Sequence, residues 1–327
     1  MKSIVKVLVA VSIACCFLAT TAMAVEIVGI ASGQPGSLGH NTGQAVAKIA
    51  NQVAKITART QPLAGTSAYV PVINRGEMSF GFVNAVEMEY AYKGTGNWEG
   101  RKNPDLCLVG VMFPLITGIA APAKLELRNV ADLKEKAGGL KIAAQYTADT
   151  TIAYYIMGAL ANGGMAYDDF KQVPVTNLVK GMEALGNGLV DVALVSLNSG
   201  AGKKANATLS GGIRYISLDD SGDAVKRLKQ FMPAASLVTV DANPNIPGLL
   251  EKSTIIKIPW VMITSKGESE DLVYRMTKVI AENYKKLGET FGAFKRGSAE
   301  QMAPAIDVPY HPGALRYYKE AGIPVGK

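Results

Sequence analysis

Short apolar runs alternate along the chain with longer segments in which apolar residues recur at every third or fourth position. The short runs are typical of buried strands, and the longer segments of amphipathic helices. The first pair is a strand expected at residues 26–31 and a following helix with Val46, Ile49, Ala50 and Val53 on one face. Further strands are expected at residues 56–61, 78–84, 106–113, 140–145, 172–176, 191–197, 213–218 and 255–264.

This alternation predicts an α/β protein whose parallel sheets carry helices on both faces. The strands are too many for one compact core, so we expect two lobes. The pattern restarts after Pro114, and prolines recur between residues 247 and 259. We therefore predict a discontinuous lobe 1, made of residues 25–117 and 256–327, and a lobe 2 inserted into it as residues 118–255.

The N-terminus has the three-part layout of a secretory signal peptide. Two lysines accompany an apolar run at residues 7–18, and Ala22-Met23-Ala24 follows as an A-x-A cleavage pattern. The apolar run is too short to span a bilayer. We therefore expect residues 1–24 to be removed after Ala24 and the protein to be periplasmic, with an uncleaved membrane anchor as the alternative.

Charge and cysteine content narrow the possible functions. The net charge of +7 is scattered along the chain, which argues against nucleic-acid binding. Cys15 and Cys16 fall in the signal peptide, where a lipoprotein would be acylated, and Cys107 is expected to be a buried core residue. Two histidines and no paired acids at strand ends leave little for a metal site or catalysis. We expect no cofactor and no enzymatic activity, with a secreted α/β enzyme as the alternative.

The glycine-rich turn after the first strand is the clearest candidate for a binding site. Backbone N–H groups at a helix N-terminus are unpaired, and the helix dipole attracts anions there. The glycines at 33, 36 and 39 do not have the spacing of a dinucleotide or P-loop motif. An ordinary strand-to-helix turn is the alternative. The turn residues expected to contact a small organic anion are Gly33, Gln34, Gly36, Ser37 and Leu38.

Polar residues at the ends of other strands complete the candidate site. In open α/β sheets, ligands bind at the carboxyl ends of the strands. Tyr146, Thr147 and Thr150 form the loop after the strand at 140–145, in the predicted second lobe. The remaining candidates follow the other predicted strands. Thr66 and Ser67 also fit helix N-caps, and a cap or turn is the alternative for each residue. The additional candidates are Thr66, Ser67, Asn84, Tyr146, Thr147, Thr150 and Asn198.

Several ordered segments together resemble one known family. They are residues 30–33 with 43–51, 74–84, 130–134, 189–193 and 311–318. This set resembles the TAXI family, the extracytoplasmic solute receptors that serve TRAP transporters. The resemblance implies the two-lobed periplasmic binding protein fold, with a hinge and a ligand cleft between the lobes. It also implies ligand contacts from the first glycine turn, Thr66 and Ser67, and from the loop at 147–151 in the other lobe.

The resemblance implies a function as well as a fold. The expected protein is a monomeric receptor that captures a small organic anion, a carboxylate or an amino-acid-like compound, and delivers it to TRAP-type permease subunits. Many TAXI relatives carry two aromatic residues where this chain has Ser37-Leu38, so we assign no glutamate specificity. Asn84 stands where relatives often carry Gln. A binding protein for an ABC importer and a periplasmic ligand sensor of the same fold are the alternatives.

Overall fold

The fold is taken from a computed structural model that describes residues 27–197 and 199–326. The predicted signal peptide and Asn198 lie outside the described residues. The strands are β1 (Ile27–Ser32), β2 (Thr57–Pro62), β3 (Phe80–Asn84), β4 (Leu106–Pro122), β5 (Lys141–Gln145), β6 (Lys171–Val175), β7 (Ala193–Ser196), β8 (Ile213–Tyr215), β9 (Ser236–Val240) and β10 (Ser253–Ser265).

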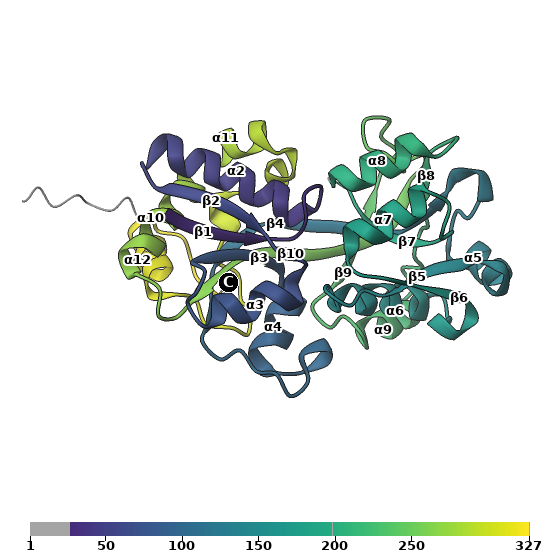
Figure 1. Ribbon diagram of the computed structural model, residues 1–327, viewed down its shortest axis with the longest axis horizontal. Helices are drawn as coiled ribbons and strands as arrows, with labels where there is room; N and C mark the ends of the chain where they lie inside the picture. The colour runs from purple at the N-terminus through teal and green to yellow at the C-terminus, as the bar shows by residue number, and fades with distance from the viewer. Residues whose placement is uncertain (1–26, 198, 327) are drawn as a thin grey trace, which may run out of the picture.

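The helices cover the strands in two groups (Figure 1). They are α2 (Leu38–Val53), α3 (Thr66–Asn74), α4 (Ala85–Lys93), α5 (Val130–Lys136), α6 (Thr151–Asn162), α7 (Leu178–Gly186), α8 (Gly200–Thr208), α9 (Gly222–Lys229), α10 (Glu270–Glu282), α11 (Tyr284–Thr290) and α12 (Pro312–Glu320). None of the helices in the described part of the chain combines the length and the hydropathy needed to span a membrane.

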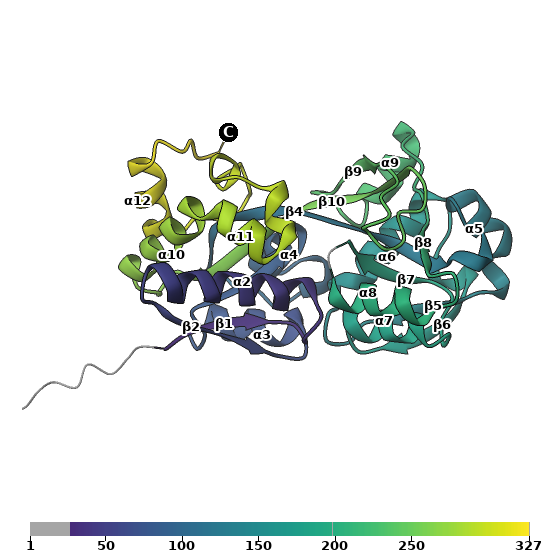
Figure 2. The same ribbon diagram turned by 90° about the horizontal axis from the view of Figure 1, so that it is seen from above.

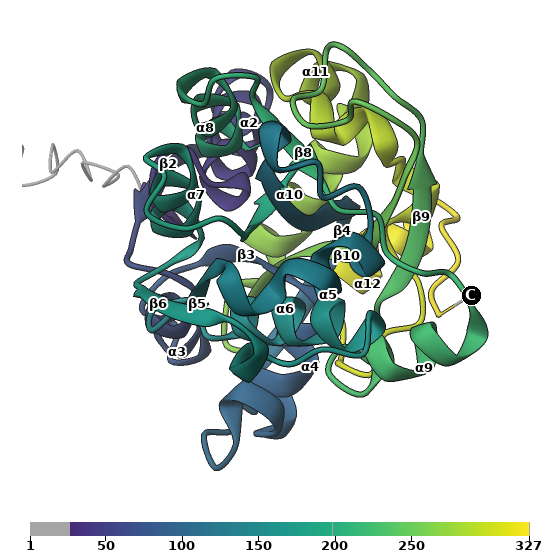
Figure 3. The same ribbon diagram turned by 90° about the vertical axis from the view of Figure 1, so that its right-hand side faces the viewer.

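The molecule has two lobes (Figures 1 and 2). Lobe 1 holds β1 to β3 with α2 to α4 and α10 to α12, and lobe 2 holds β5 to β9 with α5 to α9. Figure 3 looks onto lobe 2 and shows α7 and α8 on one side and α6 and α9 on the other. The overall architecture is therefore the predicted α/β arrangement of two lobes.

The strand directions differ from the prediction of parallel sheets. The large sheet runs in the order β2-β1-β3-β10-β4-β7, with β8 paired to β4 and β9 to β10. β1 is parallel to β2 and β3, but β10 is antiparallel to β3 and β4. β5 and β6 form a separate parallel pair. The prediction is wrong at the centre of the molecule, because β4 leaves lobe 1 in one direction and β10 returns in the other.

The two long strands β4 and β10 connect the lobes (Figure 1). They pair from Ile256 opposite Thr117 to Ser265 opposite Leu106. The expected restart after Pro114 is wrong, because β4 continues through this residue, which lies opposite Pro259. The predicted lobe boundaries fall inside these strands and stay predictions.

Burial agrees with most of the sequence pattern. In α2, Val46, Ile49 and Ala50 are buried, whereas Val53 at the last position of the helix is 42% exposed. Cys107 is buried in β4, as predicted, and burial raises the pKa of its thiol to about 11. The apolar face of α2 therefore packs into lobe 1 and fixes the position of the glycine-rich turn that precedes it.

Candidate functional site

A cavity of about 60 Å³ lies where the two lobes meet. A buried water needs roughly 10–15 Å³ of such space, so the cavity has room for a few waters or a small solute. Five of the predicted residues line it, namely Gly33, Ser37, Leu38, Thr66 and Asn84. The other walls are Gly39, Tyr69 and Glu87 from lobe 1, Leu115 and Trp260 from the connecting strands, and Asp149, Ile152, Tyr155, Leu178, Leu194 and Ser196 from lobe 2.

The N-terminus of α2 faces this cavity. Ser37 is the N-cap, and its hydroxyl accepts a hydrogen bond of 3.1 Å from the N–H of His40. The N–H groups of Leu38 and Gly39 make no hydrogen bond within the described residues, and both residues line the cavity. The first turn of α2 holds no acidic residue. This helix end therefore presents free donors and a positive dipole end to a bound anion.

Two predicted residues of the same turn are not among the cavity walls. The side chain of Gln34 donates a hydrogen bond of 2.8 Å to the carbonyl of Leu63. Gly36 has a φ of 92°, which favours glycine, and its carbonyl accepts a hydrogen bond of 3.1 Å from the N–H of Ala201 in lobe 2. These residues shape the turn and join it to the opposite lobe.

The N-terminus of α3 is occupied by a side chain from lobe 2. The Oδ1 atom of Asp149 accepts hydrogen bonds from the Thr66 N–H at 2.7 Å and from the Thr66 hydroxyl at 3.4 Å. The N–H of Ser67 donates to the carbonyl of Ala148 at 3.2 Å. The predicted side-chain caps at Thr66 and Ser67 are wrong, because Gly65 is the N-cap residue and the capping carboxylate comes from Asp149.

The lobe 2 loop approaches α3 very closely. A Cβ atom at Gly65 would lie 2.2 Å from the carbonyl oxygen of Ala148, so only glycine permits this contact. Asp149 also accepts a hydrogen bond of 3.3 Å from the N–H of Leu178, at the start of α7. The side chain of Asn177 donates to the carbonyl of Ala64 at 3.0 Å. The contacts of Asp149 with Thr66 and of Asn177 with Ala64 join the two lobes beside the cavity, whereas the bond from Leu178 to Asp149 lies within lobe 2.

The predicted loop residues of lobe 2 support this contact from outside the cavity. Gln145 and Tyr146 have φ values of 66° and 49°, a strained conformation for residues other than glycine. Tyr146 is fully buried, and Thr147 is exposed. The hydroxyl of Thr150 lies 3.2 Å from that of Ser67 in lobe 1. Tyr146, Thr147, Thr150 and Ser67 are not among the cavity walls.

Glu87 is the most unusual group in the cavity, and no sequence pattern marked it as a site residue. It is only 1% exposed, and its N–H donates to the Oδ1 atom of Asn84, the N-cap of α4, at 2.8 Å. Its Oε2 atom accepts a hydrogen bond of 3.4 Å from the Asn84 amide, and its Oε1 atom has no partner within the described residues. The three-residue spacing of Asn84 and Glu87 is typical of a helix N-terminus, but it does not reveal that the Glu87 side chain is buried.

Burial changes the acidity of both carboxyl groups. It raises the pKa of Glu87 to about 7, and the negative charge of Asp149 adds to the rise, while the side chains of Thr66, Thr151 and Trp98 oppose it. Burial also raises the pKa of Asp149, whereas the N–H groups of Thr66 and Leu178 lower it. Two carboxyl groups, Glu87 and Asp149, therefore line the cavity near the N-terminus of α3.

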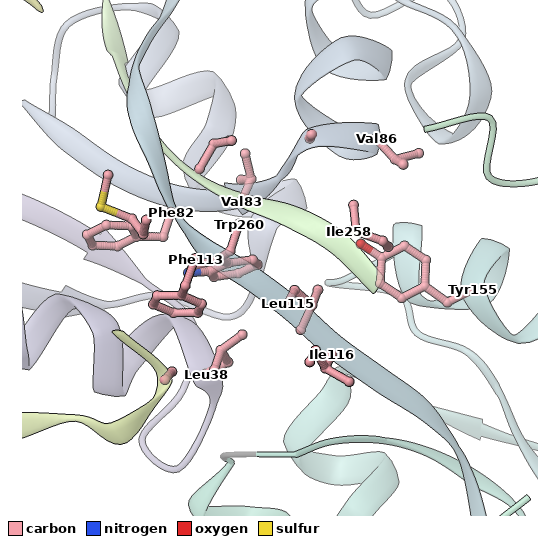
Figure 4. Close-up of a cluster of buried hydrophobic side chains, with 14 of the residues drawn as sticks. Leu38, Phe82, Val83, Val86, Phe113, Leu115, Ile116, Tyr155, Ile258 and Trp260 are labelled. Atoms are coloured by element: carbon pink, nitrogen blue, oxygen red, sulfur yellow. The ribbon is translucent and has the colours of Figure 1, made fainter. Parts of the chain in front are cut away.

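Aromatic and aliphatic side chains form the remaining walls (Figure 4). Figure 4 shows Leu38, Leu115, Tyr155 and Trp260 within one buried cluster. The Tyr155 hydroxyl and the Trp260 indole N–H are buried and make no hydrogen bond within the described residues. The sequence does not mark these aromatic residues as site residues, because in apolar segments they have the pattern of core positions.

The comparisons with known proteins fit this arrangement. A model of the NMT1-like family matches residues 30–322. The chain belongs to the NMT1-like family. The match includes both helix N-termini at the cavity and both connecting strands, so the family covers the whole two-lobed body.

Solved structures show the fold of this NMT1-like chain. A structure described as a periplasmic transporter has a TM-score of 0.59 and 12% identity over 92% of this chain and 94% of that chain. The periplasmic binding protein BugD has a TM-score of 0.58 and 13% identity over 91% and 98% of the two chains. MatC from Rhodopseudomonas palustris, solved with bound malate, has a TM-score of 0.57 and 10% identity over 83% and 90%. The NMT1-like chain therefore has the two-lobed periplasmic binding protein fold.

Proposed function

We propose that this chain is an extracytoplasmic solute receptor that captures a small organic acid and delivers it to a TRAP-type membrane transporter. The observation that carries the proposal is the free N-terminus of α2 at the interlobe cavity. The N–H groups of Leu38 and Gly39 have no partner within the described residues, and the helix dipole favours an anion there. A carboxylate of the solute would accept both hydrogen bonds.

Capture would proceed by closure of the lobes. The proposed moving bodies are residues 25–117 with 256–327, and residues 118–255, within a monomer that acts by binding alone. Walls from both lobes surround the cavity, so a solute contacts all of them only in the closed form. The solute then stabilises that form by the difference between its affinities for the closed and open forms.

A thermal-shift experiment tests solute capture. The mature protein is unfolded, dialysed free of ligand, refolded and mixed with a panel of small carboxylates. A carboxylate that binds the native state raises the melting temperature by mass action, and we expect such a shift for at least one compound. If no carboxylate shifts the melting temperature of the folded protein, the proposal is wrong.

Delivery to a TRAP-type transporter is supported by the ordered segments that resemble TAXI receptors. Deletion of this chain and deletion of its TRAP permease should each abolish uptake of the bound solute. Uptake that depends on an ABC importer, or that persists in both deletions, would contradict TRAP delivery. These outcomes would favour the importer and sensor alternatives respectively.

Export is part of the same proposal. Cleavage after Ala24 would leave Val25 as the first residue of the mature protein. N-terminal sequencing of the chain from a periplasmic extract should therefore begin at Val25. Recovery of the uncleaved chain in the membrane fraction would contradict this expectation.

A further inference from the structure

We infer that Glu87 determines specificity, because its buried carboxylate requires the bound solute to present a protonated amine and rejects a second carboxylate at that position. The inference rests on the proposed function, since it concerns the same cavity and the same solute. It adds a second recognition point to the α2 N-terminus, so that the solute carries an acid at one end and a cationic nitrogen at the other.

The position of Glu87 is the first argument. Its side chain lines the cavity, yet the residue is only 1% exposed. Asn84 holds its N–H and its Oε2 atom. The Oε1 atom makes no hydrogen bond of ordinary geometry within the described residues, although the side chains of Thr66, Thr151 and Trp98 lie close enough to lower the pKa of the carboxyl group by hydrogen bonding. A donor brought by the solute would complete the hydrogen bonding of this buried oxygen.

The charge of the cavity is the second argument. Among the described residues that line the cavity there is no Lys, Arg or His, but there are two acidic residues, Glu87 and Asp149. A second carboxylate on the solute would therefore meet like charges without a cation to balance them. A protonated amine would meet opposite charge, beside the aromatic walls of Tyr69, Tyr155 and Trp260, which also favour cations.

The pH dependence of binding separates this inference from its opposite. A protonated Glu87 would donate to an anionic group, and that mode weakens as the pH rises through about 7. An ionised Glu87 accepts from an amine, and that mode strengthens over the same range. The titratable groups that face Glu87 are Asp149, Tyr69 and Tyr155, and the pKa values of both tyrosines lie well above their ordinary value. Burial raises the pKa of Asp149 as well, so the Glu87→Gln variant, which keeps Asp149, isolates the contribution of Glu87.

The test uses solutes that differ only in the group at one end. The probes are β-alanine with malonate and γ-aminobutyrate with succinate, measured by calorimetry on the ligand-free protein. At pH 8 we expect the amino acid of at least one pair to bind about tenfold or more tightly than its dicarboxylate. Glu87→Gln should remove this preference, and Glu87→Asp should restore part of it. Glu89→Gln is the matched control, because Glu89 lies on the same helix and is not among the cavity walls.

Each result has a distinct meaning. Tighter binding of an amino acid that strengthens from pH 6 to pH 8, and a flat profile in Glu87→Gln, would support the inference. Tighter binding of the dicarboxylates, or binding that weakens as the pH rises, would overturn it while leaving the proposed receptor function intact. If no carboxylate binds the folded protein at all, the proposed function fails and this inference fails with it.

Discussion

The N-termini of α2 and α3 border the same cavity from the same lobe, yet only one of them is free. Both helices begin with a hydroxyl residue close by, Ser37 for α2 and Thr66 for α3. At α2 the first N–H groups have no partner within the described residues, whereas at α3 Asp149 of the opposite lobe accepts from Thr66 at 2.7 Å. The tertiary neighbour, and not the local sequence, decides which helix end is available to a ligand.

The two helix ends therefore have different roles, one in binding the proposed solute and the other in the contact between the lobes. The free end of α2 suits an anionic group of the solute. The capped end of α3 belongs to the contact between the lobes, together with the bonds from Ser67 to Ala148 and from Asn177 to Ala64. Opening must break these bonds, so the closed form has a stabilising contribution of its own before any solute binds.

The largest expected effect is the pH dependence of stability that Glu87, near the N-terminus of α3, should cause. The pKa of Glu87 is about 7 in the folded protein, above its ordinary value of 4.5. Glu87 therefore contributes stability that is fully present below about pH 4.5 and is lost as the pH rises through about 7. The loss is on the order of 3 kcal/mol. Urea unfolding of the ligand-free protein at pH 5 and pH 8 measures it.

Glu87→Gln provides the comparison for this pH effect. The amide cannot ionise, so most of the difference in unfolding free energy between the two pH values should disappear. Glu89→Gln should retain the wild-type difference. An unchanged pH dependence in Glu87→Gln would mean that another group is responsible.

A second, smaller effect is expected when the cap on α3 is removed. Asp149→Ala deletes the acceptor for the N–H groups of Thr66 and Leu178, and losing a cap typically costs about 1 kcal/mol. Only the Thr66 bond crosses between the lobes, so the closed form should be weakened by about 1 kcal/mol, whereas loss of the Leu178 bond lowers the stability of lobe 2. Small-angle X-ray scattering of the ligand-free protein should then show a larger radius of gyration.

Asp132→Ala is the control for this variant. Asp132 accepts hydrogen bonds from the N–H groups of Arg128 and Asn129 at the start of α5, within lobe 2. Its loss should lower stability but leave the radius of gyration unchanged. If both variants have the wild-type radius, Asp149 does not hold the lobes together.

The smallest effect should come from the free end of α2. Ser37→Ala removes the acceptor for the N–H of His40 and should cost about 1 kcal/mol of stability, as should Ser269→Ala at the N-cap of α10. Only Ser37 lines the cavity, so only Ser37→Ala should also weaken binding of a carboxylate. Equal affinity in both variants, measured by calorimetry, would show that the Ser37 side chain does not contribute to binding of the solute.

The sequence predicts the local elements of this protein well. Apolar periodicity locates β1 and α2, and the glycine-rich turn between them lies at the cavity. The inward face of α2 at Val46, Ile49 and Ala50 is buried, as expected. Such patterns are readable because residues three or four apart share one face of a helix.

The long-range parts of the site could not be predicted in this way. Asp149 and Thr66 are 83 residues apart, and no local pattern marks one as the cap of the other. Glu87 lies on a helix whose other acid, Glu89, is not buried, so its own burial depends on how α4 packs. The continuation of β4 through Pro114 was missed because proline normally ends a strand, whereas here it lies opposite a second proline.

That pair of prolines has a consequence for the speed of the receptor. Pro114 and Pro259 face each other where β4 and β10 pass between the lobes, next to the cavity residues Leu115 and Trp260. Neither proline has an amide proton, so neither can donate a hydrogen bond across the two strands there. Bending at this level breaks no hydrogen bond between these two residues. We therefore expect the release rate of the proposed solute to depend on the cavity contacts and the Asp149 cap more than on the strands that join the lobes.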